Sequence, residues 1–429
     1  MLKVFSDYLD NNYPEKRPAG FLSGESSCSI LDAGCGVGVL GICAAGALQE
    51  AGFSRIFVRA QDRDELARVF SVYNAQRNGL CAESYEAYTE PLLAGPGGQN
   101  IILSNIPAKA GLPVLEDFVR RSAATLKQNG LVFLVAVNTL ADYFRKQITA
   151  GAFLFHEENG KEHTVFVFGK IAGIKSDAAS DYSPVIFDEN FPRNYPFYIR
   201  NEASGAGGIC GEFEMEKISY RLNTVHGAPD FDSPGGAVMA AAKLALKIDP
   251  SEKLNSHLFA PFDVKKILIH DDAGQGHFAL WLANYLKREY RWVLSGRNIL
   301  ALAAARAALP EAAIVPAADI LLDCERIAEG GAAGIAKAEG KPEGFSLIAF
   351  FPDMVPAEKN PAEQLDVAWE GLTRLAAPGT ILLCGLGSTE SERFDRKKPP
   401  HWHRLGNIKR KGFRSLAYLS VSTSTNGST

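Results

Sequence analysis

An acidic side chain and three closely spaced glycines form the most chemically informative pattern in this sequence. Residues 30–40 read I-L-D-A-G-C-G-V-G-V-L, so an apolar strand would end at Asp32 and a helix would follow. Gly34, Gly36 and Gly38 lie between them, and glycine permits positive φ and lets a ligand lie against bare main chain. The first N–H groups of the helix would point at the same place. The pattern therefore predicts a cradle for a nucleotide-like ligand, with Asp32 near a cationic group.

A second acidic residue follows the next predicted strand, at residues 55–60. A carboxylate at this strand end can accept hydrogen bonds from both hydroxyls of a ribose, and each charge-assisted bond contributes about 1.5–3 kcal/mol. We therefore take Asp62, with the adjacent Arg63, as a candidate ligand-binding pair. The alternative, an acid that only caps the next helix, fits Asp64 better, because the predicted helix spans residues 65–77.

These features leave two classes of cofactor open. Residues 36–41 also spell the glycine pattern of a dinucleotide-binding turn, with an acid about 20 residues further on. The fourth predicted strand, residues 100–104, separates the two interpretations because it runs directly into Asn105, Ile106 and Pro107. An amide at a strand end, held by a proline turn, places a side-chain carbonyl and a backbone carbonyl at the ligand-binding edge of a sheet. Two such acceptors suit an amino group.

At this point the sequence resembles the class I S-adenosylmethionine-dependent methyltransferases, and within them the small-domain family that includes the ribosomal-RNA guanine-N2 methyltransferases. In that family the fourth strand ends in Asn-Pro-Pro-aromatic, often followed by a basic residue and a glycine. The residues that fit this pattern are Asn105, Pro107, Lys109 and Gly111. The resemblance extends to about residue 170 and so spans one whole domain.

Two residues depart from the family's pattern. Ile106 stands in place of the first proline and still offers its carbonyl, whereas Ala108 replaces the aromatic residue. The missing ring removes a stacking surface that is usually worth about 1–3 kcal/mol for a nucleobase. The resemblance implies that Asn105, the Ile106 carbonyl and Pro107 form the catalytic site and orient the acceptor nitrogen.

The same resemblance assigns the residues that would bind S-adenosylmethionine. The glycine turn would lie under the methionine part, Asp32 near the ammonium group and Asp62 on the ribose. The full set of cofactor-binding residues is Asp32, Gly34, Gly36, Gly38, Asp62 and Arg63.

The length and composition predict more than one domain. With 429 residues, of which 46% are hydrophobic and 22% charged, the chain is globular and too long for one ordinary core. The opening pattern returns in altered form at residues 266–277, which align by their last two glycines with the first glycine turn. This alignment puts His270 opposite Asp32 and Asp272 opposite Gly34.

The second copy lacks the other residues of the predicted site. Ser295 and Gly296 stand where Asp62 stands in the first copy, and the fourth strand ends at Pro352 without an asparagine. We therefore expect an internal duplication whose second copy keeps the scaffold and has lost the cofactor chemistry. In the methyltransferases that the sequence resembles, the degenerate copy comes first, so the order here is reversed.

These observations predict an α/β fold of two doubly wound, Rossmann-like methyltransferase domains with seven-stranded sheets, the second degenerate. The first domain would span residues 1–171. A connector with a helix near 234–248 would occupy residues 172–262. The degenerate domain would span residues 263–421 and a disordered tail residues 422–429.

Charge and cysteine usage bound the partners. The net charge of −4 gives no global basic field, so ribosomal RNA would need a local patch. The candidate patch consists of Arg396, Lys397, Lys398, Lys409, Arg410 and Lys411; the alternative is a solvated hairpin with Trp402 in the core. The seven cysteines show no C-x-x-C pair and no paired His/Cys spacing, so we expect no disulfide framework and no metal site. Without a long apolar run or signal-peptide pattern, we expect a cytoplasmic protein with no membrane partner.

The predicted function is S-adenosylmethionine-dependent methyl transfer to an acceptor nitrogen, with a guanine exocyclic amine of ribosomal RNA as the acceptor that the resemblance implies. Two alternatives remain open. One is a non-catalytic RNA- or ribosome-binding pseudomethyltransferase whose altered Asn105 loop no longer transfers methyl groups, and the other is a nicotinamide-dependent oxidoreductase.

Overall fold

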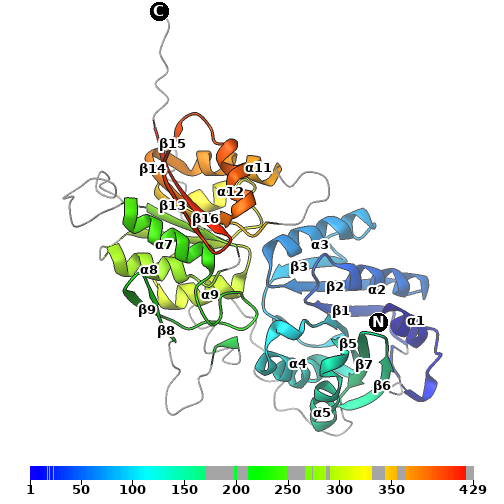
Figure 1. The fold of residues 1–429 in the computed structure, drawn as a ribbon. Helices are drawn as coiled ribbons and strands as arrows, with labels where there is room; N and C mark the ends of the chain where they lie inside the picture. The colour runs from blue at the N-terminus through cyan, green and yellow to red at the C-terminus, as the bar shows by residue number, and fades with distance from the viewer. Residues whose placement is uncertain are drawn as a thin grey trace, which may run out of the picture. The chain divides into compact units, whose positions relative to one another are not determined.

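The computed structural model describes residues 1–16, 18, 20–22, 24–170, 198–200, 211–248, 266–272, 274–286, 290–330, 344–354 and 363–421. The chain forms two compact units, Met1–Tyr198 and Ile199–Thr429 (Figure 1). The predicted tail at residues 422–429 lies outside the described residues. Within them, no helix is long and apolar enough to cross a membrane.

The first unit is built on a seven-stranded sheet with the strand order β3-β2-β1-β4-β5-β7-β6. Its strands are β1 (Ser27–Ala33), β2 (Arg55–Asp62), β3 (Tyr85–Thr89), β4 (Gln99–Asn105), β5 (Leu126–Val137), β6 (Phe153–Asn159) and β7 (His163–Gly169). Its helices are α1 (Leu2–Leu9), α2 (Val39–Glu50), α3 (Glu65–Arg77), α4 (Leu112–Thr125) and α5 (Ala141–Gly151), with short 3-10 turns η1 (Pro14–Lys16), η2 (Ala108–Ala110) and η3 (Asn138–Leu140).

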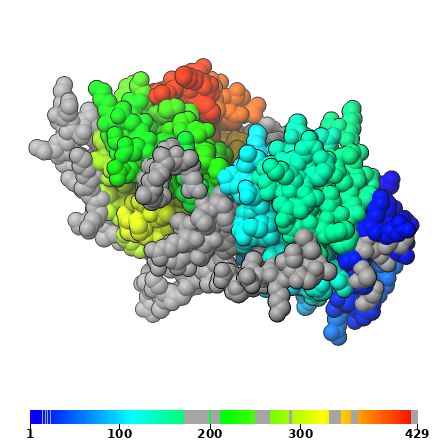
Figure 2. Space-filling view, turned by 90° about the horizontal axis from the view of Figure 1, so that it is seen from below, coloured from blue at the N-terminus to red at the C-terminus, as the bar shows by residue number. Residues whose placement is uncertain are grey.

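The strand order places the ligand-binding edge of this sheet. The chain moves from β1 outward to β2 and β3, and then returns to the other side of β1 at β4. Because crossovers between parallel strands are right-handed, α2 and α3 lie on one face of the sheet and α4 on the other. Figure 2 shows α4, α5 and the β6–β7 hairpin, coloured cyan to green, on one face of this unit. Ligands bind where the strand order reverses, which here is the carboxyl end of β1 and β4.

The second unit repeats this architecture, with the strand order β12-β11-β10-β13-β14-β16-β15. Its strands are β10 (Lys266–Asp271), β11 (Arg291–Gly296), β12 (Ala313–Pro316), β13 (Phe345–Phe351), β14 (Ala376–Gly387), β15 (Trp402–Arg410) and β16 (Phe413–Ser420), and β8 (Gly211–Met215) and β9 (Ile218–Leu222) form a separate hairpin. Its helices are α7 (Gly236–Ile248), α8 (His277–Leu286), α9 (Ile299–Ala308), α10 (Cys324–Glu329), α11 (Glu363–Leu375) and α12 (Ser388–Arg396). The predicted fold of two doubly wound seven-stranded sheets is thus confirmed.

Two boundaries differ from the expectation. The structure places β8, β9 and α7 in the second unit, although their residues fall in the segment that the sequence suggested as a connector. Helix α7 packs along β14, β15 and β16, as Figure 1 shows, and contacts α8 as α1 contacts α2 in the first unit. In the first unit, the apolar spacing predicts a helix over residues 113–128 that stops at the Asn-Gly pair 129–130. The helix α4 instead ends at Thr125, and β5 begins at once.

Candidate functional site

The first glycine turn, residues 34–38, has the bare backbone that its sequence predicts. Gly34, Gly36 and Gly38 have φ values of 77°, 53° and 88°, a region that side chains with a Cβ rarely adopt. The backbone N–H groups of Gly34 and Cys35 both donate to the carbonyl of Gln61 at the end of β2, at 2.9 and 2.8 Å. A Cβ on Gly38 would lie 2.8 Å from the hydroxyl oxygen of Tyr85. The turn is therefore fixed at its base, its backbone conformation favours glycine at all three positions, and at Gly38 there is also no space for a Cβ.

Asp32 lies beneath this turn as a fully buried carboxyl group. Its Oδ2 accepts a hydrogen bond from the backbone N–H of Gly41 at 2.8 Å, whereas its Oδ1 has no hydrogen-bond partner among the described residues. Burial raises the pKa of Asp32 to about 7, against the stabilising bond from Gly41. A cationic group placed beside Oδ1 would supply the missing interaction and favour the ionised form.

Asp62 connects the glycine turn to the end of β2. Its Oδ2 accepts from the N–H of Gly36 at 2.9 Å and its Oδ1 from the N–H of Asp64 at 3.0 Å. Each carboxylate oxygen can accept a second bond, so Asp62 keeps capacity for a ligand hydroxyl. Asp64 instead caps α3 by accepting from the N–H groups of Leu66 and Ala67, which confirms the predicted cap. Arg63 is half-buried between the two acids.

Asn105 lies at the same edge, on the other side of the glycine turn. Asp32 pairs with Ala60 on β2 and with Leu103 on β4, so Asp62 and Asn105 both extend two residues beyond it. With strands about 4.8 Å apart, the two residues are separated by about 10 Å and flank the first glycine turn. The structure therefore brings the predicted cofactor residues and Asn105 together.

The chain after Asn105 forms a short turn. Asn105 and Pro107 are exposed, whereas the Ile106 side chain is buried. The N–H of Ala110 donates to the carbonyl of Pro107 at 3.0 Å and closes η2, which exposes Ala108 and Lys109. The position of the missing aromatic ring is thus an open surface beside the amide.

A cluster of polar residues anchors the loop after β3, and the sequence analysis missed two of its members, Arg59 and Gln61. The Arg59 guanidinium forms an ion pair with Glu90 at 2.7 Å and lies 3.6 Å from the ring centroid of Tyr88. Gln61, fully buried, donates to Glu90 at 3.0 Å and accepts from the N–H of Leu93 at 3.1 Å. The pattern that could have revealed them is the pair of polar residues at alternate positions of an otherwise apolar strand, because buried polar groups require partners.

The second unit fills the corresponding edge with its own side chains. His270 and Arg297 lie 3.2 and 3.6 Å from the Oδ1 of Asp272, and Arg297 also pairs with Asp353 at 3.2 Å. These contacts join the ends of β10, β11 and β13. Asp271 is also buried; its Oδ1 accepts from the N–H of Gly274, its Oδ2 has no partner among the described residues, and burial raises its pKa to about 7.

The chain segment before α7 binds to the second glycine turn. Gln275, which is fully buried, accepts from the N–H of Val225 at 2.6 Å and donates to the carbonyl of Pro229 at 2.8 Å. His277 at the start of α8 contacts the hydroxyl of Tyr220 at 2.8 Å and the carbonyl of Asp230 at 2.9 Å. The side chains of Gln275 and His277 at the second glycine turn are therefore hydrogen-bonded to the protein itself. At the first glycine turn the corresponding surface is bare backbone.

The strand registers correct the sequence alignment of the two copies. His270 pairs with Ser295 as Ala33 pairs with Gln61, and Gln61 and Ser295 each lie three residues before the side chain that caps the next helix. His270 is therefore the counterpart of Ala33, and the apolar residue before it is the counterpart of Asp32. The glycine-based alignment was wrong here because the second turn is one residue longer, which a match anchored on glycines does not detect.

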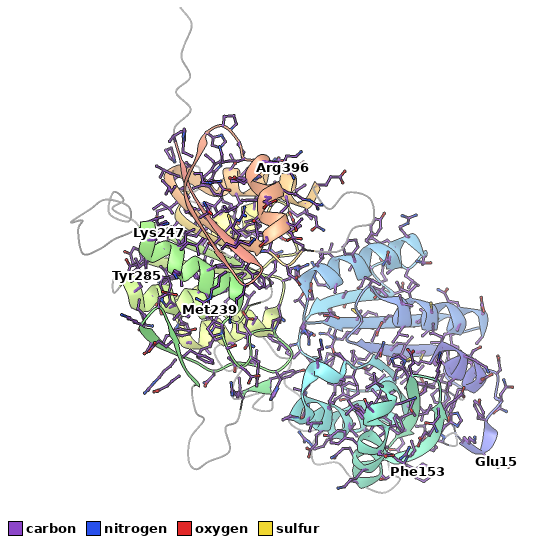
Figure 3. The ribbon with its side chains drawn as sticks, viewed as in Figure 1. Glu15, Phe153, Met239, Lys247, Tyr285 and Arg396 are labelled. Atoms are coloured by element: carbon purple, nitrogen blue, oxygen red, sulfur yellow. The ribbon has the colours of Figure 1, made fainter. Side chains whose placement is uncertain are left out.

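The six basic residues proposed as an RNA patch fall into two groups. Arg396, Lys397 and Lys398 follow from the end of α12, where Figure 3 labels Arg396, and residues 409–411 lie at the far end of β15, about 25 Å along that strand. Lys397 pairs with Asp366 at 3.0 Å, and Arg410 pairs with a glutamate at 3.5 Å. Trp402 between the groups is fully buried, in line with the hairpin alternative.

Comparison with known proteins places this architecture in a class. Residues 20–159 match the family model of the methyltransferase small domain. Among solved structures, the 16S rRNA N2 G1207 methyltransferase of T. thermophilus, in complex with AdoMet and guanosine, is 14% identical with a TM-score of 0.53, over 91% of this chain and 88% of that chain. The ribosomal protein L11 methylase of Lactobacillus delbrueckii subsp. bulgaricus is 18% identical with a TM-score of 0.30, over 35% of this chain and 73% of that chain. No curated protein sequence matches this chain.

The fold is that of the class I methyltransferases, present twice in one chain. Residues 20–159, which match the model of the methyltransferase small domain, carry the first glycine turn, Asp62 and Asn105.

Proposed function

We propose that the first unit binds S-adenosylmethionine at the carboxyl edge of its sheet and transfers the methyl group to an acceptor nitrogen, a guanine exocyclic amine of ribosomal RNA. The observation that carries the proposal is the first glycine turn. Its three glycines have positive φ and lie between the buried Asp32 and Asp62, the residue proposed to bind the ribose. The matching family model supports the same cofactor.

The residues present fit the cofactor. The partnerless Oδ1 of Asp32 suits the ammonium group of the methionine part, and the bare backbone of the turn accommodates its chain. Asp62 has acceptor capacity left for ribose hydroxyls. The second unit has an apolar residue in place of Asp32 and a glycine in place of Asp62, and so we propose one cofactor site in the chain.

The chemistry asks little of the protein beyond alignment. When bound, the cofactor supplies an electrophilic methyl group on a sulfonium. The Asn105 side-chain carbonyl and the Ile106 carbonyl would accept the N–H groups of the acceptor amine and aim its lone pair at that methyl carbon. Transfer would form the nitrogen–carbon bond as the sulfur–carbon bond breaks, and the amine would then lose a proton to solvent. Such alignment is worth several kcal/mol, so no strong base is required.

The acceptor class comes from Asn105 and Pro107 and from the family pattern that they match. The T. thermophilus enzyme with the similar fold is an rRNA N2 guanine methyltransferase, and we extend that acceptor class to this chain. Ala108 leaves the amide without an adjacent ring, so the acceptor base would be held by fewer stacking contacts.

Two measurements test the proposal. Calorimetry with S-adenosylhomocysteine should show micromolar binding at one site per chain; a stoichiometry near two, or preference for a dinucleotide, would contradict it. Incubation with methyl-labelled cofactor and separate RNA, protein and small-molecule fractions should label RNA. Label in another fraction would refute the acceptor, and cofactor binding without any label would favour the pseudoenzyme.

A further inference from the structure

The loop after β3 makes a strained turn next to the proposed cofactor site. In residues 91–94, here called the 91–94 turn, Leu93 has a φ of 61° although it is a bulky side chain and 1% exposed. Such a conformation is unfavourable for a residue other than glycine and persists only where its surroundings hold it. The unfavourable φ of Leu93 therefore indicates that contacts from other parts of the unit hold the 91–94 turn in place.

Side chains from three other elements hold the 91–94 turn. Gln61 of β2 accepts from the N–H of Leu93 at 3.1 Å and donates to the carbonyl of Ala94. Arg121 of α4 donates to the carbonyl of Leu93 at 3.3 Å. The hydroxyl of Tyr198 accepts from the N–H of Leu92 at 3.2 Å.

The 91–94 turn faces the first glycine turn. A Cβ on Gly34 would lie 3.5 Å from the Cδ2 of Leu92, so the Leu92 side chain borders the glycine cradle. The N–H of Gly34 donates to the carbonyl of Gln61, the residue before Asp62, and the N–H of Gly36 in the same turn donates to Asp62, the proposed ribose ligand. Leu92 is therefore on the ribose side of the proposed cofactor site, where the attached base would also lie.

Tyr198 differs from the other anchors because it comes from the last residue of the first unit. Its side chain is 3% exposed, and its hydroxyl lies within electrostatic reach of Arg63, Asp117 and Arg121. Burial raises the pKa of Tyr198, so the phenol stays neutral throughout the physiological range. The chain thus returns to the cofactor edge with a buried neutral acceptor.

We propose that Tyr198 is a positioning residue for the cofactor: its hydroxyl fixes the Leu92 N–H and, with Gln61, keeps the 91–94 turn closed against the first glycine turn over the adenosine end of the ligand. This inference rests on the proposed function. Without the hydroxyl, the Leu92 N–H loses its partner and the strained Leu93 relaxes, which withdraws one wall of the site. In the second unit the counterpart of Gln61 is Ser295, which contacts His270 instead.

The test compares two tyrosines whose buried hydroxyls are removed one at a time. In Tyr198→Phe, the dissociation constant of S-adenosylhomocysteine should rise about fivefold or more, as for the loss of one buried hydrogen bond. Tyr220→Phe, which removes the buried hydroxyl that contacts His277 in the second unit, should leave it within about twofold. Calorimetry is performed at a temperature where circular dichroism shows all proteins folded, so that lost stability alone does not change affinity.

The outcomes are distinguishable. Unchanged affinity in Tyr198→Phe, or an equal loss in both variants, would overturn the positioning role. Failure of the unmodified protein to bind S-adenosylhomocysteine would instead overturn the proposed function. Hydrogen exchange adds a local readout: the Leu92 amide should exchange faster in unliganded Tyr198→Phe than in the unmodified protein, and an unchanged rate would refute the bond on which the proposal depends.

Discussion

The two units have the same strand order but treat the carboxyl edge of the sheet in opposite ways. In the first unit, three left-handed glycines leave bare backbone between Asp62 and Asn105. In the second, an ion-paired arginine, Arg297, crosses from one strand end toward another, and Gln275 binds the chain's own backbone. In the second unit, internal contacts thus occupy the sheet edge that the first unit leaves as bare backbone.

The comparison also shows which single observation is insufficient. Asp32 and Asp271 are both buried carboxyls with one oxygen that lacks a partner among the described residues, and burial raises the pKa of each to about 7. Only Asp32 lies under a turn with three left-handed glycines, whereas Asp271 caps its own turn through Gly274. A buried unpaired carboxylate therefore indicates a ligand site only together with open backbone beside it.

The largest expected effect is on methyl transfer and comes from Asn105, whose amide has no counterpart in the second unit. Asn105→Ala should reduce methyl transfer by more than about 1,000-fold, because the lost alignment is worth several kcal/mol in the transition state. Cofactor affinity should stay within about twofold, since the amide faces the acceptor. Single-turnover transfer and calorimetry on the same preparation measure both quantities. A parallel loss of cofactor affinity would place Asn105 in the cofactor site instead.

The next effect contrasts the ends of β2 and β11. Asp62→Ala should weaken S-adenosylhomocysteine binding by about 2–4 kcal/mol, because two charge-assisted bonds to the ribose are lost. Ser295→Ala, at the end of β11, should leave the affinity unchanged. Calorimetry of both variants decides the matter. Equal losses would show that the second unit also contributes to binding and would break the contrast between the copies.

Much of the fold could be predicted from the sequence, because buried parallel strands read as continuous apolar runs and glycine turns mark where strand passes to helix. The equivalence of the copies was less accessible. One extra residue in the second turn moves His270 from the level of Asp32 to that of Ala33, and only the strand registers reveal it.

The candidate site could be predicted for the residues that belong to one local motif, such as the first glycine turn. Residues that act through distant partners could not. Tyr198 contacts Leu92 from 106 residues away, and Gln61 fixes the 91–94 turn through side-chain bonds that no local pattern specifies. In the same way, the basic residues near 396 and 409 are close in sequence, but the extended β15 holds them apart.

A smaller effect is expected from pH. Below about pH 7 the free first unit holds Asp32 protonated, and a ligand ammonium group beside it favours the carboxylate, so binding releases a proton. Affinity for S-adenosylhomocysteine should therefore rise with pH by up to about tenfold per unit below pH 7 and level off above it. Calorimetry between about pH 5.5 and about pH 8.5 measures the slope.

The matched variants separate the two buried carboxyls. Asp32→Asn should abolish this pH dependence, whereas Asp271→Asn should retain it. In the unliganded protein both groups lower the stability as the pH rises from about 4 to about 7, because the unfolded chain ionises first. Bound ligand should reverse only the share of this pH-dependent loss of stability that comes from Asp32. An affinity that increases toward acid pH would contradict the assigned role.

The smallest expected effect concerns the charged surface of the second unit, whose role would be to hold RNA rather than cofactor. Lys409 and Lys411 are exposed and, within the described part of the chain, have no carboxylate at ion-pair distance, whereas Lys397 and Arg410 do. If this surface contacts phosphates, the double change of Lys409 and Lys411 to Ala should lower RNA affinity a few-fold and reduce the salt slope of binding by about 1 per lost contact.

The control changes Lys397 and Arg410 to Ala and should have less effect, because their charges are already partly neutralised. Filter binding of ribosomal RNA fragments across a salt series measures both. An unchanged slope in the first variant would remove this surface from the RNA interface and leave the second unit with a structural role alone.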